Sequence, residues 1–395
     1  MSRVTLALCA FAAFLDGYDI QALGLAIPGL ASHLQVAPTA FAVALSLSLA
    51  GMAAGAMLLA PWADRFGRQK MMIFALILIG VTMLAAVTSQ SPAQLAFWRT
   101  LTGLGMGALL PLAITVAAES APAKNRTLTI TLVVSCTAVG SFAAALAAPG
   151  LEGTFGWPGI FYVGAGMPMA AAALFFFLGA AKGPVAAESN VPSNDRGGKF
   201  GALFSDAFRL RTTLLWVIFF ISLLATYSLI SWLPTLLTDA GWTRGEAQRA
   251  TSFLALGSVV GGLLLAWAAD RGRAVPALAM AYILAAIAFA GVGMAPGSKA
   301  AWSLLIFLIG AGSIGSQLAL GSLAASFYPA AIRATGVGWS SGIGRAGSIF
   351  GPLALAAMMT AGLDASAIIA SLAAPMIICV ICVLMLPKAL KNDVL

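Results

Sequence analysis

The stretch Ala60-Pro-Trp-Ala-Asp64-Arg65-Phe-Gly67-Arg68-Gln-Lys70 stands between two long apolar runs, residues 38–60 and 71–89. Each run has about the 20 residues that a helix needs to cross the hydrocarbon of a bilayer. The charged stretch therefore indicates a short polar loop between two transmembrane helices. Part of it recurs in the second half of the chain, where Asp270-Arg271 repeats Asp64-Arg65 at an offset of 206 residues.

The composition extends this picture to the whole chain. Hydrophobic residues make up 61% and charged residues 9% of 395 residues, and the mean hydropathy is +0.99. A soluble domain carries roughly 25% charged residues, so the surface of this protein faces lipid. Twelve apolar stretches are long enough to span: 4–26, 38–60, 71–89, 93–117, 127–149, 158–180, 212–236, 247–269, 274–295, 299–324, 336–360 and 364–387. The sequence predicts an all-α integral membrane protein with twelve transmembrane helices.

The halves of the chain repeat each other. Gly103-x-Gly105 returns as Gly310-x-Gly312 after 207 residues, and Pro122 with Arg126 returns as Pro329 with Arg333 at the same offset. A polar segment rich in Gly, Pro, Ser and Asn, residues 181–211, separates the two halves. We expect an N-terminal six-helix bundle over 1–180, a cytoplasmic linker over 181–211 and a C-terminal six-helix bundle over 212–395. A duplicated unit of this kind is typical of transporters that move two halves around a central site.

The positive charges indicate the orientation. Sixteen Lys and Arg residues fall on the side that holds both termini, three fall on the other side, and two fall inside helices. Lys and Arg in short loops favour the cytoplasmic side. We therefore expect a multi-pass protein of the inner (cytoplasmic) membrane with both termini cytoplasmic. Since the net charge of +8 follows topology, nucleic acid is not an expected partner.

Several motifs now carry a family resemblance. The stretch over residues 60–70 resembles the cytoplasmic signature of the major facilitator superfamily, and Arg99-Thr-Leu-Thr-Gly103-Leu-Gly105-Met-Gly107 resembles the helix-4 motif of that superfamily. Asp16-Gly17-Tyr18-Asp19 and the segment over residues 328–352 are similar to those of the aromatic acid:proton symporter family. The resemblance implies a proton-coupled transporter of organic acids. Sugar-acid, sialate and monocarboxylate carriers share much of the same pattern.

Four charged residues lie well inside predicted helices, away from the helix ends: Asp16, Asp19, Arg99 and Arg345. A charge at the centre of a bilayer costs about 2.5–3.5 kcal/mol on the insertion scale. None of the four has a charged counterpart at the repeat offset, so we interpret them as functional residues rather than as parts of the shared scaffold.

Three of these charges suit proton coupling. Asp16 and Asp19 share a helix face, and Arg99 is predicted at the depth of Asp19. Two carboxylates in a low dielectric resist ionising together, which would make a site that loads and unloads a proton. The alternative is a static ion-pair network that holds the first and fourth helices together.

Arg345 is predicted near the midplane, where its guanidinium can bind a carboxylate with two parallel donors. It could instead cap carbonyl groups or pair with an aspartate of the first helix. Tyr18, Tyr227 and Trp339 are candidate substrate contacts through ring stacking, although an aromatic stripe is more often packing.

A second group of charges is predicted at the cytoplasmic helix ends. We interpret it as a gate that holds the outward-facing state without touching substrate. Its members are Asp64, Arg65, Arg68, Glu119 and Arg126.

The leading functional hypothesis is a proton-coupled symporter that imports a small organic carboxylate by alternating access, and the resemblance implies an aromatic one. The alternatives are uptake of a non-aromatic acid and export by proton antiport. Residues 147–150, Ala-Ala-Pro-Gly, match the helix-5 motif of drug exporters poorly, which favours symport. One His and no acidic cluster argue against an enzyme and a metal site. We expect no cofactor, with the proton as coupling ion, and a monomer.

Overall fold

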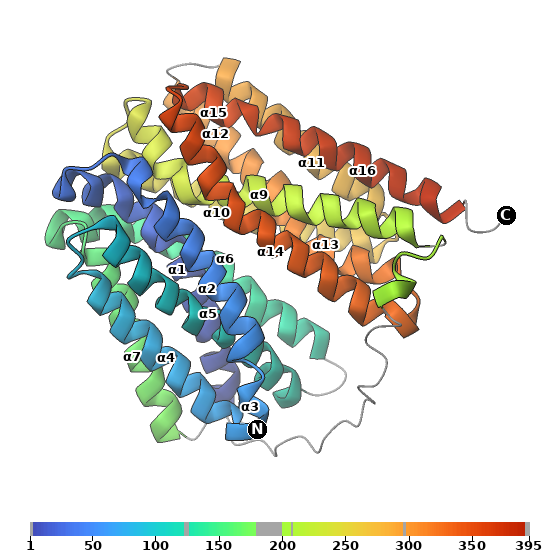
Figure 1. Ribbon diagram of the computed structural model, residues 1–395, viewed down its shortest axis with the longest axis horizontal. Coiled ribbons are helices and arrows are strands. Elements are labelled where there is room, and N and C mark those ends of the chain that lie inside the picture. The colour runs from blue at the N-terminus through green and yellow to red at the C-terminus, as the bar shows by residue number, and fades with distance from the viewer. Residues whose placement is uncertain (1–2, 122–125, 179–199, 207, 295–297, 392–395) are drawn as a thin grey trace. The chain divides into compact units, whose positions relative to one another are not determined.

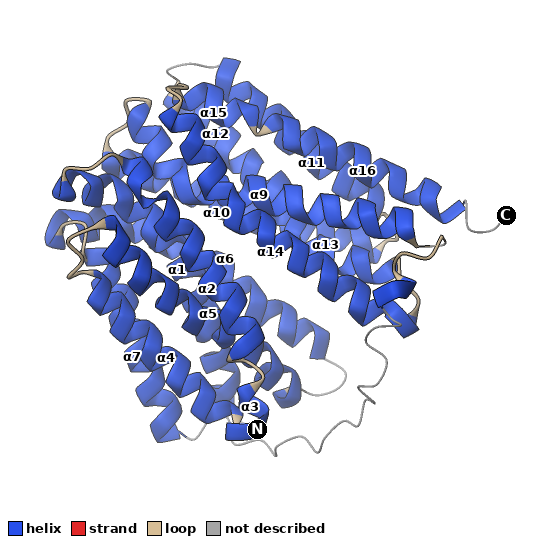
Figure 2. Cartoon of the chain, in the orientation of Figure 1, coloured by secondary structure: helices blue, strands red, loops and turns tan. Residues whose placement is uncertain are grey.

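The computed structural model describes residues 3–121, 126–178, 200–206, 208–294 and 298–391. This described part consists of helices and loops and contains no strand (Figure 2). Twelve helical stretches within it are long and apolar enough to cross a membrane. The predicted all-α membrane fold with twelve spans is confirmed. Most of the predicted linker, residues 181–211, lies outside the described residues.

Figure 1 traces the helices along the chain. The first six spans are α1 (Arg3–Leu34), η1 with α2 (Pro38–Phe41 and Ala42–Leu58), α4 (Arg68–Ala86), α5 (Pro92–Ser120), α6 (Arg126–Phe155) and α7 (Gly159–Leu178). The next six are α9 (Arg209–Asp239), α10 (Arg244–Asp270), α11 (Ala274–Met294), α12 with η4 and α13 (Lys299–Ile309, Gly310–Ile314 and Gly315–Ser326), α14 (Ala330–Thr360), and α15 with α16 (Ala365–Ser371 and Ala373–Lys391).

The charged stretch over residues 60–70 folds as a tight connection between α2 and α4. It contains the short helix α3 (Trp62–Phe66), which ends at Gly67 with a φ of +92°. Only glycine adopts this backbone conformation without strain. The reversal at Gly67 therefore separates α3 from α4 and places the charges of the stretch at a helix end.

Helix α1 is longer than the apolar run predicts. The sequence favoured a helix over 4–26, whereas α1 continues through Pro28 to Leu34, and Gln35 follows with a φ of +54°. An apolar run measures the width of the hydrocarbon, while a helix ends where its backbone hydrogen bonding ends. The additional turns of α1 bring polar groups close to α6 and α10.

Glycines bring the paired helices into backbone contact, and the two halves do this in the same way. A Cβ at Gly103 of α5 would lie 2.1 Å from the carbonyl oxygen of Ser48 in α2. A Cβ at Gly310 would lie 2.1 Å from the carbonyl oxygen of Leu254 in α10. These are repeat-related positions, so the sequence repeat corresponds to a repeated helix contact.

Contacts divide the chain into two units. The first unit comprises Met1–Ser189 and Ile230–Ser252, and the second comprises Asn190–Leu229 and Phe253–Leu395. The end of α9 and the start of α10 therefore group with α1 to α7. We call the end of the first unit where α1 ends and α10 begins its far side. The bundles predicted over 1–180 and 212–395 remain a prediction. They were defined by the sequence repeat, whereas the two units are defined by contacts between residues.

Candidate functional site

The first unit contains a buried ion pair between α1 and α5. The Arg99 guanidinium donates through Nη1 to Asp19 Oδ1 at 2.5 Å and through Nη2 to Asp19 Oδ2 at 3.0 Å. Arg99 is 2% and Asp19 is 1% exposed. Two parallel N–H···O bonds to one carboxylate are a strong and directional arrangement. The structure thus brings together two of the residues that the sequence placed at one depth.

A third helix joins this pair. Ser48 of α2 accepts a hydrogen bond from Arg99 Nη2 at 3.3 Å, and the same Nη2 lies 3.4 Å from the carbonyl oxygen of Asp19. Asp16, one turn earlier on α1, is also buried, with 2% of its surface exposed. The predicted proton-coupling residues therefore all lie in the interior of the first unit.

The backbone between the two aspartates is packed against α6. A Cβ at Gly17 would lie 1.7 Å from the carbonyl oxygen of Thr137, and a Cβ at Gly140 would lie 1.9 Å from that of Phe14. Each glycine fits because it has no side chain. This close contact fixes the rotation of α1 about its axis and therefore the direction of Asp16 and Asp19.

Tyr18 is packed inside the first unit between α1 and α7. It is 3% exposed, and its hydroxyl donates to the carbonyl oxygen of Ile160 in α7 at 2.8 Å. The ring fills space beside Gly164. This placement favours packing over ring stacking with a substrate, the alternative that the sequence left open.

The predicted gate residues lie at the end of the first unit where α4 begins and α5 ends, opposite to the far side. Arg68, at the start of α4, forms an ion pair with Glu119, near the end of α5. Arg65 lies over the ring of Phe66, 5.7 Å from its centroid. The side chains of Asp64 and Arg126 lie outside the described part of the structure. Their role in the gate therefore remains a prediction.

In the second unit, Arg345 lies on α14 and is half-buried. Its neighbours keep α14 close to α9, since a Cβ at Gly347 would lie 2.1 Å from the carbonyl oxygen of Phe220. Within the described residues, the Arg345 guanidinium has no hydrogen bond or ion pair, and its carbonyl accepts from Ser348. This guanidinium keeps its donors for another group.

The two remaining aromatic candidates differ. Trp339 is 46% exposed, with its ring centroid 4.7 Å from that of Phe200 and 6.1 Å from that of Trp216. This ring cluster occupies much of the Trp339 face. Tyr227, on α9, is half-buried.

Sequence reasoning missed two polar groups. In the second unit, Tyr282 donates to Ser222 at 3.0 Å and Gln317 donates to the same Ser222 hydroxyl at 2.8 Å. On the far side of the first unit, Glu152 lies 3.5 Å from Arg244. Neutral polar residues carry no signal in a hydropathy profile. The sequence places Arg244 outside the predicted spans, so it indicates topology alone, and Glu152 carries no motif that would pair it with Arg244.

No group of three His, Cys, Asp or Glu residues that could hold a metal ion occurs in the described ranges.

Comparisons with known proteins place these observations in a family. The sequence model of the Major Facilitator Superfamily matches residues 9–352. The gallate transporter of Pseudomonas putida is 32% identical over 91% of this chain and 86% of its own length. The 4-hydroxybenzoate transporter PcaK of Pseudomonas aeruginosa is 31% identical over 93% of this chain and 88% of its own length. The 3-(3-hydroxy-phenyl)propionate transporter of Escherichia coli is 31% identical over 91% and 87%.

Solved structures share the fold. The crystal structure of a D-xylose–proton symporter matches with a TM-score of 0.78 and 15% identity, over 98% of this chain and 97% of that chain. A bacterial homologue of the human lysosomal transporter Spinster, inward-facing and unoccupied, matches with a TM-score of 0.75 and 16% identity, over 100% and 98%. The family and its relatives are transporters and not enzymes. With the family model covering most of its length, this chain belongs to the Major Facilitator Superfamily.

Proposed function

We propose that this chain imports a small organic carboxylate together with protons by alternating access, and that the carboxylate is an aromatic acid. Its relatives in Pseudomonas putida, Pseudomonas aeruginosa and Escherichia coli are named as transporters of gallate, 4-hydroxybenzoate and 3-(3-hydroxy-phenyl)propionate. The asymmetry of Lys and Arg supports the inner membrane as its location, with both termini cytoplasmic.

The observation that carries the proposal is the buried Asp19–Arg99 pair with Asp16 one turn away. Protonation of Asp19 would remove the negative charge that holds the Arg99 guanidinium. The guanidinium would then favour a different partner, and α1 and α5 would no longer be held at this point. A protonation event would thereby change the contact between two helices, which is what coupling requires.

The substrate carboxylate is assigned to Arg345 in the second unit. Its guanidinium is half-buried and has no partner among the described residues, so a carboxylate could take two of its donors. Proton and substrate would then be handled by different units. The ion pair of Arg68 with Glu119 supports a gate on the expected cytoplasmic side.

The test is uptake of radiolabelled 4-hydroxybenzoate by proteoliposomes with an imposed pH gradient. We expect accumulation against the concentration gradient in wild type and its loss in both Asp16→Asn and Asp19→Asn. At least one of these variants should still exchange the acid across the membrane, because the carboxylate site is intact. Asp206→Asn, at an exposed position outside the spans, is the matched control and should accumulate normally.

Two outcomes would overturn parts of the proposal. Uphill uptake that persists in both helix-1 variants would exclude the aspartates as the proton site. Efflux of the acid driven by an inward proton gradient would favour antiport, and a panel of sugar acids and monocarboxylates that competes better than aromatic acids would favour the non-aromatic alternative.

A further inference from the structure

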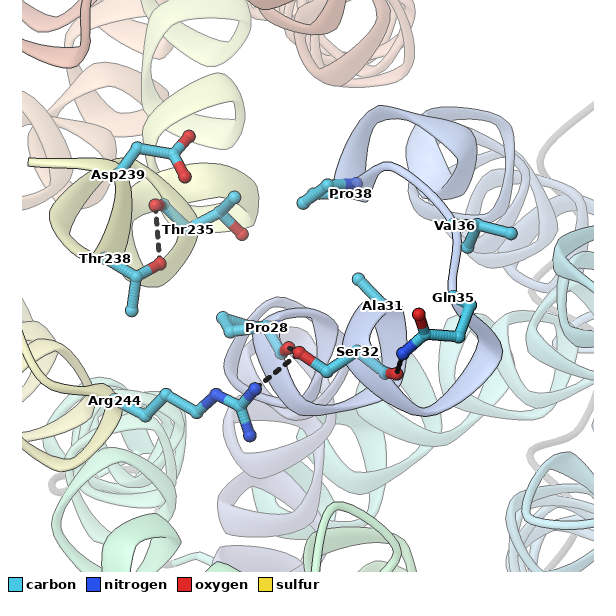
Figure 3. Close-up of a pocket in the computed structure, with 10 residues that line it drawn as sticks. All are labelled: Pro28, Ala31, Ser32, Gln35, Val36, Pro38, Thr235, Thr238, Asp239 and Arg244. Carbon is cyan, nitrogen blue, oxygen red and sulfur yellow. Dashed lines mark hydrogen bonds between the residues drawn. The ribbon is translucent and has the colours of Figure 1, made fainter.

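A pocket opens on the far side of the first unit. Its volume is about 420 Å³, and its walls come from the end of α1, the turn that follows α1, the end of α9 and the start of α10 (Figure 3). Pro28, Ala31 and Pro38 form an apolar part of the wall, while Thr235, Asp239 and Arg244 contribute polar groups. The size falls within the range of about 300–1,000 Å³ that is usual for small-molecule sites.

Arg244 brings a positive charge to this pocket. It is 46% exposed on its side chain, its Nη2 donates to the Ser32 hydroxyl, and its Nη1 lies 3.5 Å from Glu152 Oε1. A guanidinium has five N–H donors, and these contacts use two of them. Arg244 is therefore held in place beside the pocket with donors to spare.

Thr235 provides an independent observation. Its side chain is 1% exposed and its hydroxyl has no hydrogen-bond partner among the described residues. The hydroxyl of its neighbour Thr238, in contrast, donates to the carbonyl oxygens of Pro234 and Thr235. Figure 3 shows the side chains of Thr235, Pro28 and Pro38 around the same open space. A buried hydroxyl without a partner is unfavourable, so a ligand group that reached it would relieve that cost.

The guanidinium, the apolar prolines and the hydrogen-bonding groups of the wall together suit one class of ligand. A carboxylate would bind the Arg244 guanidinium, a ring would pack against the prolines, and a hydroxyl could donate to the Asp239 carboxylate or to Thr235. A simple anion fits less well, because Asp239 would repel it. We propose that this pocket is an outer docking site that binds a hydroxylated aromatic carboxylate before it enters the membrane. This inference rests on the proposed function and adds to it a second binding site and a preference for hydroxylated acids.

Glu152 competes with such a ligand for Arg244. Glu152 also accepts from Gln248 Nε2 at 2.5 Å, and Gln248 Nε2 lies 3.3 Å from the carbonyl oxygen of Leu25 in α1. A Cβ at Gly29 would lie 2.7 Å from Glu152 Oε1, so the glycine leaves room for this carboxylate. The ends of α1 and α6 and the start of α10 meet at this point. A bound carboxylate would use the spare donors of Arg244 but share its positive charge, which weakens the attraction between Arg244 and Glu152.

Two variants distinguish a docking site from a purely structural contact between Arg244 and Glu152. The docking site predicts KM changes of opposite sign, and the structural contact predicts changes of the same sign. If Arg244 binds the ligand, Arg244→Gln raises the KM for uptake of radiolabelled 4-hydroxybenzoate about two- to fivefold, the range of an exposed ion pair. Glu152→Gln lowers the KM, because the competing carboxylate is gone. If Arg244 and Glu152 only hold helices together, both variants shift the KM in the same direction, which would refute the docking site.

Ionic strength and a matched control sharpen the measurement. Raising the salt concentration should increase the KM of wild type more than that of Arg244→Gln, because salt screens the attraction between the guanidinium and the acid. Arg249→Gln, an exposed arginine on the same helix that does not line the pocket, should behave as wild type. An unchanged KM in Arg244→Gln would overturn the proposal.

Thr235→Val tests the hydroxyl with little risk to folding, since it keeps the shape and removes an unpaired polar group. We expect it to raise the KM for 4-hydroxybenzoate and to leave the KM for benzoate unchanged. Equal effects on both acids, or none on either, would show that Thr235 does not contact the ligand hydroxyl.

Calorimetric binding of 4-hydroxybenzoate to purified protein in detergent separates this inference from the proposed function. If wild type accumulates the acid under a pH gradient while Arg244→Gln keeps wild-type KM and affinity, the docking site fails and the function stands. If wild type binds the acid with a dependence on Arg244 but never accumulates it, proton-coupled import fails and the site stands. If 4-hydroxybenzoate neither binds to wild type nor is transported by it, both the docking site and the import of this acid are refuted.

Discussion

At the scale of single residues, the Asp19–Arg99 pair is a buried ion pair with two hydrogen bonds. Both side chains are buried, and the guanidinium donates to the carboxylate through its two terminal nitrogens, Nη1 and Nη2. Removing one partner of a buried pair leaves an uncompensated charge and costs roughly 3–5 kcal/mol, whereas replacing both partners leaves no unpaired charge behind. The pair therefore has a clear stability signature that can be separated from its role in transport.

We expect Asp19→Asn to lower the thermal unfolding temperature of the purified protein more than the double variant Asp19→Asn with Arg99→Gln. If the pair couples protons, the double variant is stable and cannot accumulate substrate under a pH gradient. If the pair is only a static connection between α1 and α5, the double variant is stable and accumulates substrate normally. Scanning fluorimetry and proteoliposome uptake on the same preparations decide between these outcomes.

Arg345 allows a second prediction at this scale. A lysine keeps the charge but loses the two parallel donors of the guanidinium. We expect Arg345→Lys to weaken binding of 4-hydroxybenzoate and Arg345→Ala to nearly eliminate it, with a loss of about 2–5 kcal/mol. Calorimetry on folded, detergent-purified protein that also carries Arg244→Gln measures this, because the outer pocket then contributes little to binding. Unchanged affinity in Arg345→Ala with transport abolished would make Arg345 a residue of the conformational cycle instead.

At the scale of helices, glycines decide which spans can touch. A Cβ at Gly107 of α5 would lie 1.9 Å from the carbonyl oxygen of Met52 in α2, and this oxygen belongs to the backbone and cannot rotate away. Small residues at such contacts let membrane helices approach closely. The close approach of α2 and α5 also positions Ser48 beside Arg99, so packing between helices supports the geometry of the buried pair.

We therefore expect Gly107→Ala to destabilise the protein by about 1–3 kcal/mol, the usual cost of overpacking. Gly166→Ala on α7 is the matched control, because a Cβ there meets nothing within 4 Å. The control should unfold at the wild-type temperature or slightly above it, since alanine favours a helix. Equal unfolding temperatures for both variants would show that α2 and α5 can separate at no cost.

At the scale of the whole molecule, orientation in the membrane is the property that the charge pattern predicts. Helix α4 offers a simple test, because Lys70 at its start and Gln90 beyond its end are both exposed. In a cysteine-free background, an impermeant maleimide added to intact cells whose outer membrane has been permeabilised should label Gln90→Cys and spare Lys70→Cys. Lysis should make Lys70→Cys reactive. The reverse pattern would place the termini outside the cytoplasm.

Much of the fold could be read from the sequence, because hydropathy and glycine spacing act locally. A span needs a run of apolar residues, so all twelve spans were predicted near their observed places. The offset of Gly103 from Gly310 predicted a repeat that the structure carries into matching backbone contacts. Helix ends were less predictable, as the eight additional residues of α1 show, because a helix continues as long as its backbone is hydrogen-bonded.

From the sequence alone follow the twelve spans of this membrane protein, the four charged residues that lie well inside them, and the prediction that Asp19 and Arg99 lie at similar depth. The tertiary structure adds that Arg99 binds Asp19 through two bonds, that the Tyr18 hydroxyl donates to Ile160, and that Glu152 lies beside Arg244 across 92 residues of sequence. Each of these choices depends on how far a helix is rotated about its axis and shifted along it. Contacts such as Gly17 against Thr137 set those two quantities, and no local property of the sequence encodes them.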